Sequence, residues 1–143
     1  MNNVKYPLAL SATFIWIGFV CAISFMEAWL KFTAPGITIP LGLGIGRVVF
    51  HALNKVEWVL CAIIIGNYVY TLPKRFSYTM VFFSIAISIL IIETFYALPT
   101  LDARATLYIK GVFVHPSNLH FYYIAMEFLK VTALLIAGYR LFK

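Results

Sequence analysis

Four long apolar segments divide this chain, and they constrain its fold more than any other feature. They cover residues 8–32, 45–72, 77–98 and 119–142. Each is longer than the roughly 20 residues that a helix needs to cross a bilayer. Because lipid offers no water to free backbone groups, each segment is expected to be helical. The sequence therefore predicts an all-α integral membrane protein, with four transmembrane helices in an antiparallel bundle that forms one domain over residues 1–143.

The composition excludes an ordinary soluble domain. Hydrophobic residues make up 63% of the chain and charged residues only 11%, whereas soluble domains have about 45–50% and about 25% respectively. The net charge of +6 suits anionic head groups at the ends of the spans. No basic stretch is interleaved with aromatic residues in a soluble segment, so nucleic acid is not an expected partner. The expected partner is the lipid bilayer, and association into a homo-oligomer is left open.

The loops between the spans contain proline and glycine residues that favour turns. The stretch "TAPGITIPLGLGIG" joins the first two spans, and "LPTLDARATLYIKGVFVHPSN" joins the last two. Within the second loop, "ATLYIKGVFV" alternates weakly and is rich in β-branched residues, which predicts a short hairpin or a re-entrant loop.

Basic residues indicate the orientation. Lys74 and Arg75 lie in the shortest loop, and the C-terminus is basic as well. By the positive-inside rule, both termini are expected in the cytoplasm and the two longer loops outside. The predicted location is a bacterial inner membrane.

Four of the five acidic residues fall inside the predicted spans, one in each span. They are Glu27, Glu57, Glu93 and Glu127. Because successive helices alternate in direction, all four are expected in the half of the membrane next to the two long loops. Two histidines open the second and fourth spans on the same side, namely His51 and His120. Ionisable residues within membranes usually face the bundle interior and serve a function. A one-sided pocket, rather than a pore, is therefore expected, because the opposite halves of the spans are apolar.

This set of residues suggests a metal site or an acid–base site. The proposed ligands of a divalent metal ion are Glu27, Glu57, Glu93, Glu127, His51 and His120. The proposed catalytic carboxylates are Glu57, Glu93 and Glu127, acting on a small lipid-soluble substrate. The proposed substrate-binding residues are Asn54, Tyr96 and Tyr123. The histidine and glutamate of one span are six or seven residues apart, unlike the Glu-x-x-His of two-metal bundles, so they do not easily hold one ion.

Several other functions stay open at this point, and the sequence does not decide whether the chain is an enzyme. His51 and His120 match in depth and could hold a b-type haem between two helices. The carboxylates could also form part of a proton- or cation-conducting transporter. In a structural subunit of a membrane complex, they would pair with other chains.

The order of glutamate, proline-bearing loop, histidine and glutamate occurs in both halves of the chain. This order suggests a parallel repeat of two helical hairpins. In addition, "RVVFHALNKVE" resembles the second helix of the membrane-associated eicosanoid and glutathione metabolism family, whose Asn-x-x-Glu pair matches Asn54 and Glu57. That resemblance implies a glutathione- or eicosanoid-type membrane enzyme, although the third span lacks the arginine of that family. The stretches "FMEAWLKFTAP" and "LNKVEWVLC" resemble DoxX-type four-helix membrane proteins. Neither resemblance assigns a site.

Overall fold

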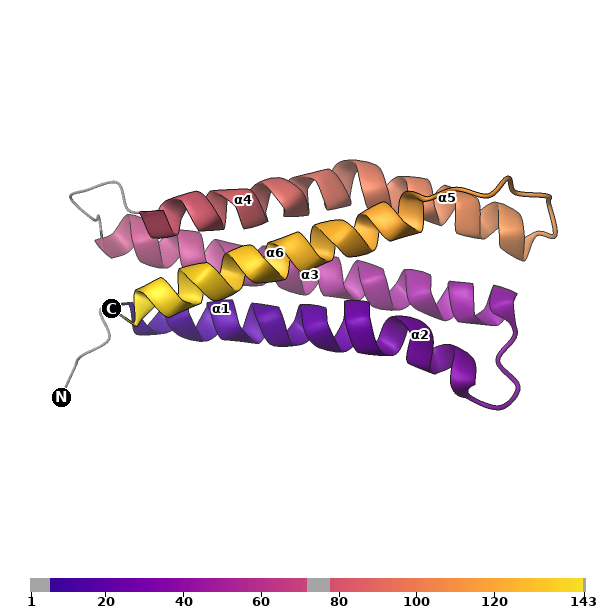
Figure 1. Cartoon of the computed structure of the whole chain (residues 1–143), viewed down its shortest axis with the longest axis horizontal. Coiled ribbons are helices and arrows are strands. Elements are labelled where there is room, and N and C mark those ends of the chain that lie inside the picture. Colours follow the sequence, from indigo (N-terminus) through magenta and orange to yellow (C-terminus); the bar gives the residue numbers. More distant parts are fainter. Residues whose placement is uncertain (1–5, 72–77, 143) are drawn as a thin grey trace.

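The computed structural model describes residues 6–71 and 78–142, and within these ranges the chain is helical without a strand (Figure 1). Four helices in this part of the chain are long and apolar enough to cross a membrane. They are Pro7–Thr33, Ile39–Thr71, Tyr78–Ile109 and Leu119–Leu141. The predicted set of four apolar helices is therefore confirmed for the described residues. Lys74 and Arg75, which indicated the orientation, lie outside them.

The first long helix changes its winding along its length. It begins as α1 (Pro7–Val20), continues as a π-helix, η1 (Cys21–Glu27), and ends in α2 (Ala28–Leu30) and a short 3₁₀ turn, η2 (Lys31–Thr33). A proline at the start costs little, because the first N–H groups of a helix have no partner within it. The chain then turns at Gly36, whose φ of 81° favours glycine.

Helix α3 (Ile39–Thr71) begins at Ile39 and not at residue 45, so part of the predicted loop is helical. Two glycines one turn apart, Gly42 and Gly46, let the first helix approach the α3 backbone closely. A Cβ atom at position 42 would overlap the ring of Phe32, and one at position 46 would lie 3.2 Å from Lys31 Nζ. Close packing therefore outweighs the low intrinsic helix propensity of this glycine-rich segment.

The third long helix consists of α4 (Tyr78–Ile92), a π-helix, η3 (Glu93–Ala97), and α5 (Leu98–Ile109). The predicted hairpin or re-entrant loop within "ATLYIKGVFV" is wrong, because its first half continues the helix and packs against α3. The helix ends where Gly111 adopts a φ of 73°. Its N–H and that of the next residue bond back to Tyr108 and Leu107, in the pattern that terminates many helices.

Helix α6 (Leu119–Leu141) packs against α4 and α1, and α1 packs against α3. The start of α1 and the end of α6 lie at the same end of the bundle (Figure 1). Trp16, Leu90 and Leu134 are fully buried between the helices.

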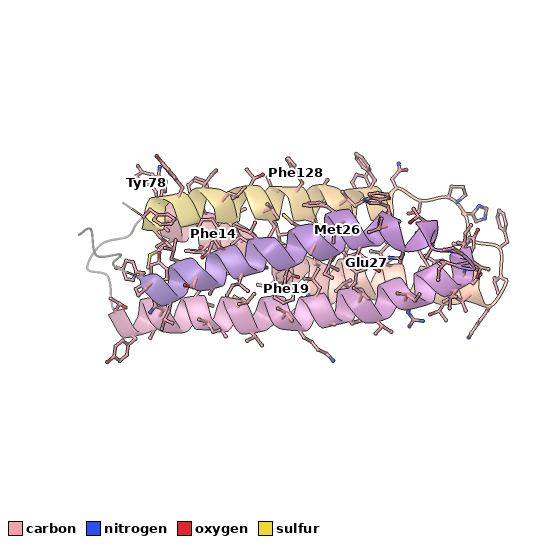
Figure 2. The ribbon with its side chains drawn as sticks, turned by 90° about the horizontal axis from the view of Figure 1, so that it is seen from below. Phe14, Phe19, Met26, Glu27, Tyr78 and Phe128 are labelled. Atoms are coloured by element: carbon pink, nitrogen blue, oxygen red, sulfur yellow. The ribbon has the colours of Figure 1, made fainter. Side chains whose placement is uncertain are left out.

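The outer surface of the bundle is apolar. Figure 2 shows its side chains, among them Phe14, Phe19 and Phe128, which are 42%, 43% and 68% exposed. Monomeric soluble proteins rarely expose continuous apolar surface on this scale. The outer surface is therefore consistent with a protein that contacts lipid.

Because α6 packs closely on α1, a larger side chain is expected to lower the stability of the protein at some glycine positions and not at others. A Cβ atom on Gly138 would meet the ring of Phe14 at 3.3 Å, whereas one on Gly66 would meet nothing within 4 Å. Gly138→Ile is therefore expected to destabilise the protein by about 1–3 kcal/mol through overpacking, and Gly66→Ile is the matched control on an exposed helix face. Thermal unfolding in detergent micelles measures both, and equal midpoints for the two variants would contradict this packing.

Candidate functional site

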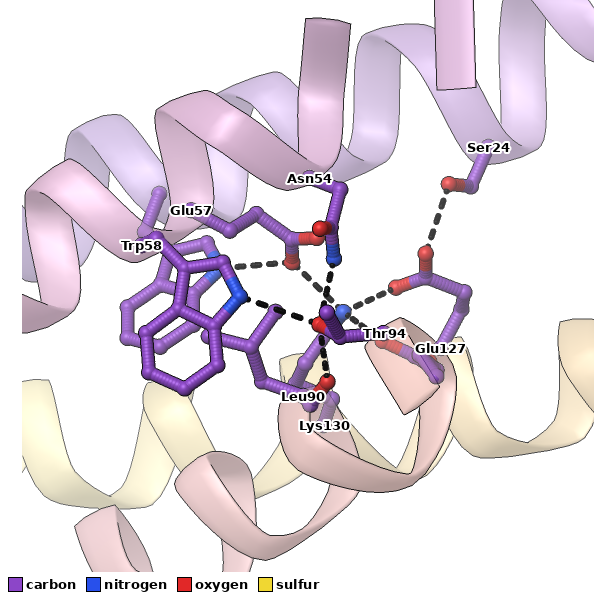
Figure 3. A network of polar contacts seen from close by, with 10 residues as sticks. Ser24, Asn54, Glu57, Trp58, Leu90, Thr94, Glu127 and Lys130 are labelled. Atoms are coloured by element: carbon purple, nitrogen blue, oxygen red, sulfur yellow. Dashed lines mark hydrogen bonds and ion pairs between the residues drawn. The ribbon is translucent and has the colours of Figure 1, made fainter. Parts of the chain in front are cut away.

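A buried cluster of three carboxylates surrounds the ammonium group of Lys130 (Figure 3). Lys130 Nζ lies 2.5 Å from Glu57 Oε1, 2.5 Å from Glu93 Oε2 and 2.9 Å from Glu127 Oε2. All four side chains are at most 1% exposed. We refer to these four residues as the Glu–Lys cluster.

Three long helices bring the Glu–Lys cluster together. Glu127 and Lys130 are three residues apart on α6 and therefore share a face. Glu57 comes from the middle of α3, and Glu93 begins the π-helix η3. Pro99, two residues after η3, cannot donate a backbone N–H, and such positions commonly coincide with a change in helix winding.

The first helix completes the surroundings of the cluster by donating two hydrogen bonds. Trp16 Nε1 donates to Glu57 Oε1 at 2.8 Å, and Ser24 Oγ donates to Glu127 Oε1 at 3.0 Å. Ser24 lies in the π-helix η1. Every long helix of the described chain therefore contributes at least one polar group.

A second set of hydrogen bonds, centred on Thr94, fixes α3 against the third helix beside the cluster (Figure 3). Thr94 Oγ1 accepts from Asn54 Nδ2 at 2.9 Å and from Trp58 Nε1 at 3.0 Å, and it donates to the Leu90 carbonyl at 2.7 Å. Since Thr94 follows Glu93 directly, these bonds also fix the position of the Glu93 backbone.

The charges of the Glu–Lys cluster do not cancel on their own. Three carboxylates and one ammonium carry a net charge of −2 when all four groups are ionised. A net charge that is removed from water is very costly unless it is paired. Moreover, Glu93 Oε1 is buried and has no hydrogen-bond partner within residues 6–71 and 78–142. The charges balance when two of the carboxyls carry protons or when a further cation joins the cluster.

The structure brings three of the four predicted glutamates together. Glu57, Glu93 and Glu127 offer oxygens that lie within 4.8 Å of one another. Glu27 is not in this group, because its carboxylate pairs with Lys31 at 3.2 Å near the end of the first helix. The four glutamates therefore do not share one interior position.

The two histidines predicted as ligands also lie apart from the cluster. The ring of His51 pairs with Asp102, which also accepts a bond from Arg47 Nε at 3.3 Å. His120 instead lines a cavity near the loops that join the helices. A metal site that combines all six predicted ligands is therefore not assembled in this arrangement.

The three residues predicted to bind substrate have different surroundings. Asn54 bonds to Thr94, and Tyr123 is 2% exposed and lines the same cavity as His120. Tyr96 is 65% exposed on the outside of the bundle. Residues three apart, such as Glu93 and Tyr96, share a face of an ordinary α-helix, but the wider turn of the π-helix η3 changes that register.

Sequence reasoning missed the central role of Lys130 as well as the roles of Trp16, Ser24 and Thr94. The spacing of Lys130 from Glu127 was a signal for one ion pair only. The comparisons give no further help, because no family model, no curated protein and no solved structure matches this chain.

Removal of the central ammonium is expected to be costly. Lys130→Met keeps much of the side-chain volume but leaves three neighbouring carboxyls without their shared partner, so we expect a loss of about 3–5 kcal/mol of stability. Lys55→Met is the control, because Lys55 is on the exposed side of α3. Unfolding in mixed micelles measures the difference, and wild-type stability of Lys130→Met would show that the carboxyls do not depend on the ammonium.

Proposed function

We propose that this chain is an integral membrane protein, with its helices antiparallel, whose Glu–Lys cluster binds and releases protons as a buried acid–base centre. The observation that carries this proposal is the charge imbalance of three enclosed carboxyl groups around one ammonium. Two protons balance the charge without any further component. Carboxyl groups that hold protons inside a protein are suited to give them up when a ligand or a partner changes the local charge.

The position of Lys130 favours protons over a divalent metal ion. Three carboxylates within 4.8 Å of one another form a set of oxygen ligands that suits Mg²⁺ or Mn²⁺. However, Lys130 Nζ lies between these oxygens, where such an ion would have to bind. A metal would need to displace this ammonium group from a fully buried position. For haem ligation, His51 would have to leave Asp102.

An acid–base centre is also favoured over a continuous ion path. On the far side of the Glu–Lys cluster from the cavity, the space between the helices is filled by apolar side chains, including Leu60, Leu90, Leu134 and Ala137, each at most 6% exposed. The buried charged residues of the described chain therefore lie on one side of this apolar layer. A site of this form supports proton exchange with one face of the bundle.

Protons on the cluster are expected to be visible by infrared spectroscopy. Difference spectra of the purified protein between acid and alkaline buffer should contain a C=O band of protonated carboxyl groups. Glu93→Gln should remove part of this band, because it removes one carboxyl while keeping its shape. Glu27→Gln should leave the buried part of the band unchanged, since Glu27 is outside the cluster. A band that Glu93→Gln leaves unchanged, together with one divalent ion per chain by elemental analysis, would replace the proton proposal with a metal site.

The proposed orientation is tested by cysteine labelling of a variant without Cys21 and Cys61. Cysteine at Ser117, in the loop before α6, should react with an impermeant reagent added outside intact cells. Cysteine at Lys74 should react only after the cells are opened, because the positive-inside rule keeps the Lys74 loop in the cytoplasm. The opposite labelling pattern would place the termini outside.

A further inference from the structure

A cavity of about 330 Å³ lies between four segments at the end of the bundle that carries the long connections. These segments are the end of the first helix (α2 and η2), the first half of α3, α5 and the start of α6. Ligand sites in proteins commonly enclose about 300–1,000 Å³, so the cavity has room for one small ligand. It is separate from the Glu–Lys cluster, whose residues do not line it.

Most of the cavity wall is apolar. Phe32, Phe50, Leu98 and Leu101 contribute to it, and Phe50 packs edge-on against Tyr123 with a ring separation of 5.5 Å. Gly42 and Gly46 also line the cavity, and a side chain at either position would meet Phe32 or Lys31. The wall is therefore suited to an apolar ligand body.

Two basic side chains line the cavity, and each has an acidic partner. Lys31 and Arg47 line the cavity together with the ring of His120. The Lys31 ammonium pairs with Glu27 at 3.2 Å, and Asp102 is the acidic residue among the lining side chains. Arg47 contacts Asp102 through Nε at 3.3 Å. A guanidinium has five N–H donors, so the donors of its two terminal nitrogens take part in none of the contacts described for residues 6–71 and 78–142. These donors are arranged to bind two oxygens of one anion.

We propose that this cavity binds a small single-chain amphiphile with one anionic group. The apolar body lies against Phe50 and Leu98, and its carboxylate or phosphate binds to Arg47 with support from Lys31. A small cavity excludes a two-chain phospholipid. The proposal does not rest on the acid–base function, because no residue of the Glu–Lys cluster contacts the cavity.

The test uses the purified protein in detergent micelles and radiolabelled decanoate, with a proximity assay that detects only protein-bound ligand. Wild type should bind decanoate saturably. Unlabelled decanoate and decyl phosphate should compete, whereas decanol should compete at least about tenfold more weakly, because it lacks the charge that strengthens a hydrogen bond to arginine. Inorganic phosphate should not compete. Absence of saturable binding, equal competition by decanol, or competition by inorganic phosphate would each overturn the proposed ligand class.

Two variants and a control locate the ligand. Arg47→Gln should weaken decanoate binding about tenfold or more while decanol binds as before. Ala105→Phe, which fills the cavity, should abolish binding of both ligands. Arg104→Gln is the control, because the Arg104 guanidinium bonds to the His115 carbonyl outside the cavity. Each variant is used only if its thermal midpoint stays near that of wild type; if Ala105→Phe fails, Leu101→Phe replaces it. Unchanged binding in both Arg47→Gln and the filled-cavity variant would overturn the proposal.

The two proposals fail separately. Glu93→Gln should bind decanoate like wild type, since Glu93 lies outside the cavity, even though it alters the infrared carboxyl band. Conversely, Arg47→Gln should leave that band unchanged. Loss of decanoate binding in Glu93→Gln would contradict the independence of the two sites.

Discussion

The contact of one ammonium group with three carboxyl groups is the interaction on which the rest of this bundle depends. In a bilayer, where we propose that this chain lies, apolar side chains gain little by leaving one apolar surface for another, so they orient helices only weakly. Polar groups are different, because each must find a partner inside the bundle. Lys130 draws α3 and the third helix toward α6, and the donors Trp16 and Ser24 add the first helix. The rotation of each helix about its axis follows from these contacts.

The two π-helices occupy corresponding places in the two halves of the chain. One lies in the first helix of each half of the chain, and each presents a polar residue to the cluster, Ser24 from η1 and Glu93 from η3. Glu57 and Glu127 take corresponding places in the second helix of each half. The repeat that the sequence suggests equates Glu27 with Glu93, whereas the first helix contributes Ser24 to the cluster, so the repeat stays a prediction. The two halves differ at the position three residues after these glutamates. This position is Leu60 in α3 and Lys130 in α6, so only the second half supplies an ammonium group to the cluster.

The sequence predicted the four helices well because apolar length is a property of each segment alone. It predicted the helix ends less well. Ile39 and Ile109 lie beyond the expected ends because packing between α3 and α5 stabilises segments whose local residues favour turns or strands. Three glutamates meet as expected, but the position of Glu27 and the exposure of Tyr96 depend on helix rotation and on π-helical winding. Neither can be derived from ordinary helical spacing.

The cavity and the Glu–Lys cluster place different polar groups at different depths of the bundle. Toward the long connections, Lys31 and Arg47 line the cavity, and each pairs with an acidic side chain. Beyond Tyr123, which lies one helical turn before Glu127, three carboxyls gather around one ammonium. On the proposals above, an anionic group binds at the cavity because Arg47 keeps unused N–H donors there, whereas the Glu–Lys cluster takes up protons because its three carboxylates outnumber its one ammonium. The two proposed sites would therefore respond to different species, and an anionic ligand at Arg47 would stay outside the Glu–Lys cluster, whose residues do not line the cavity.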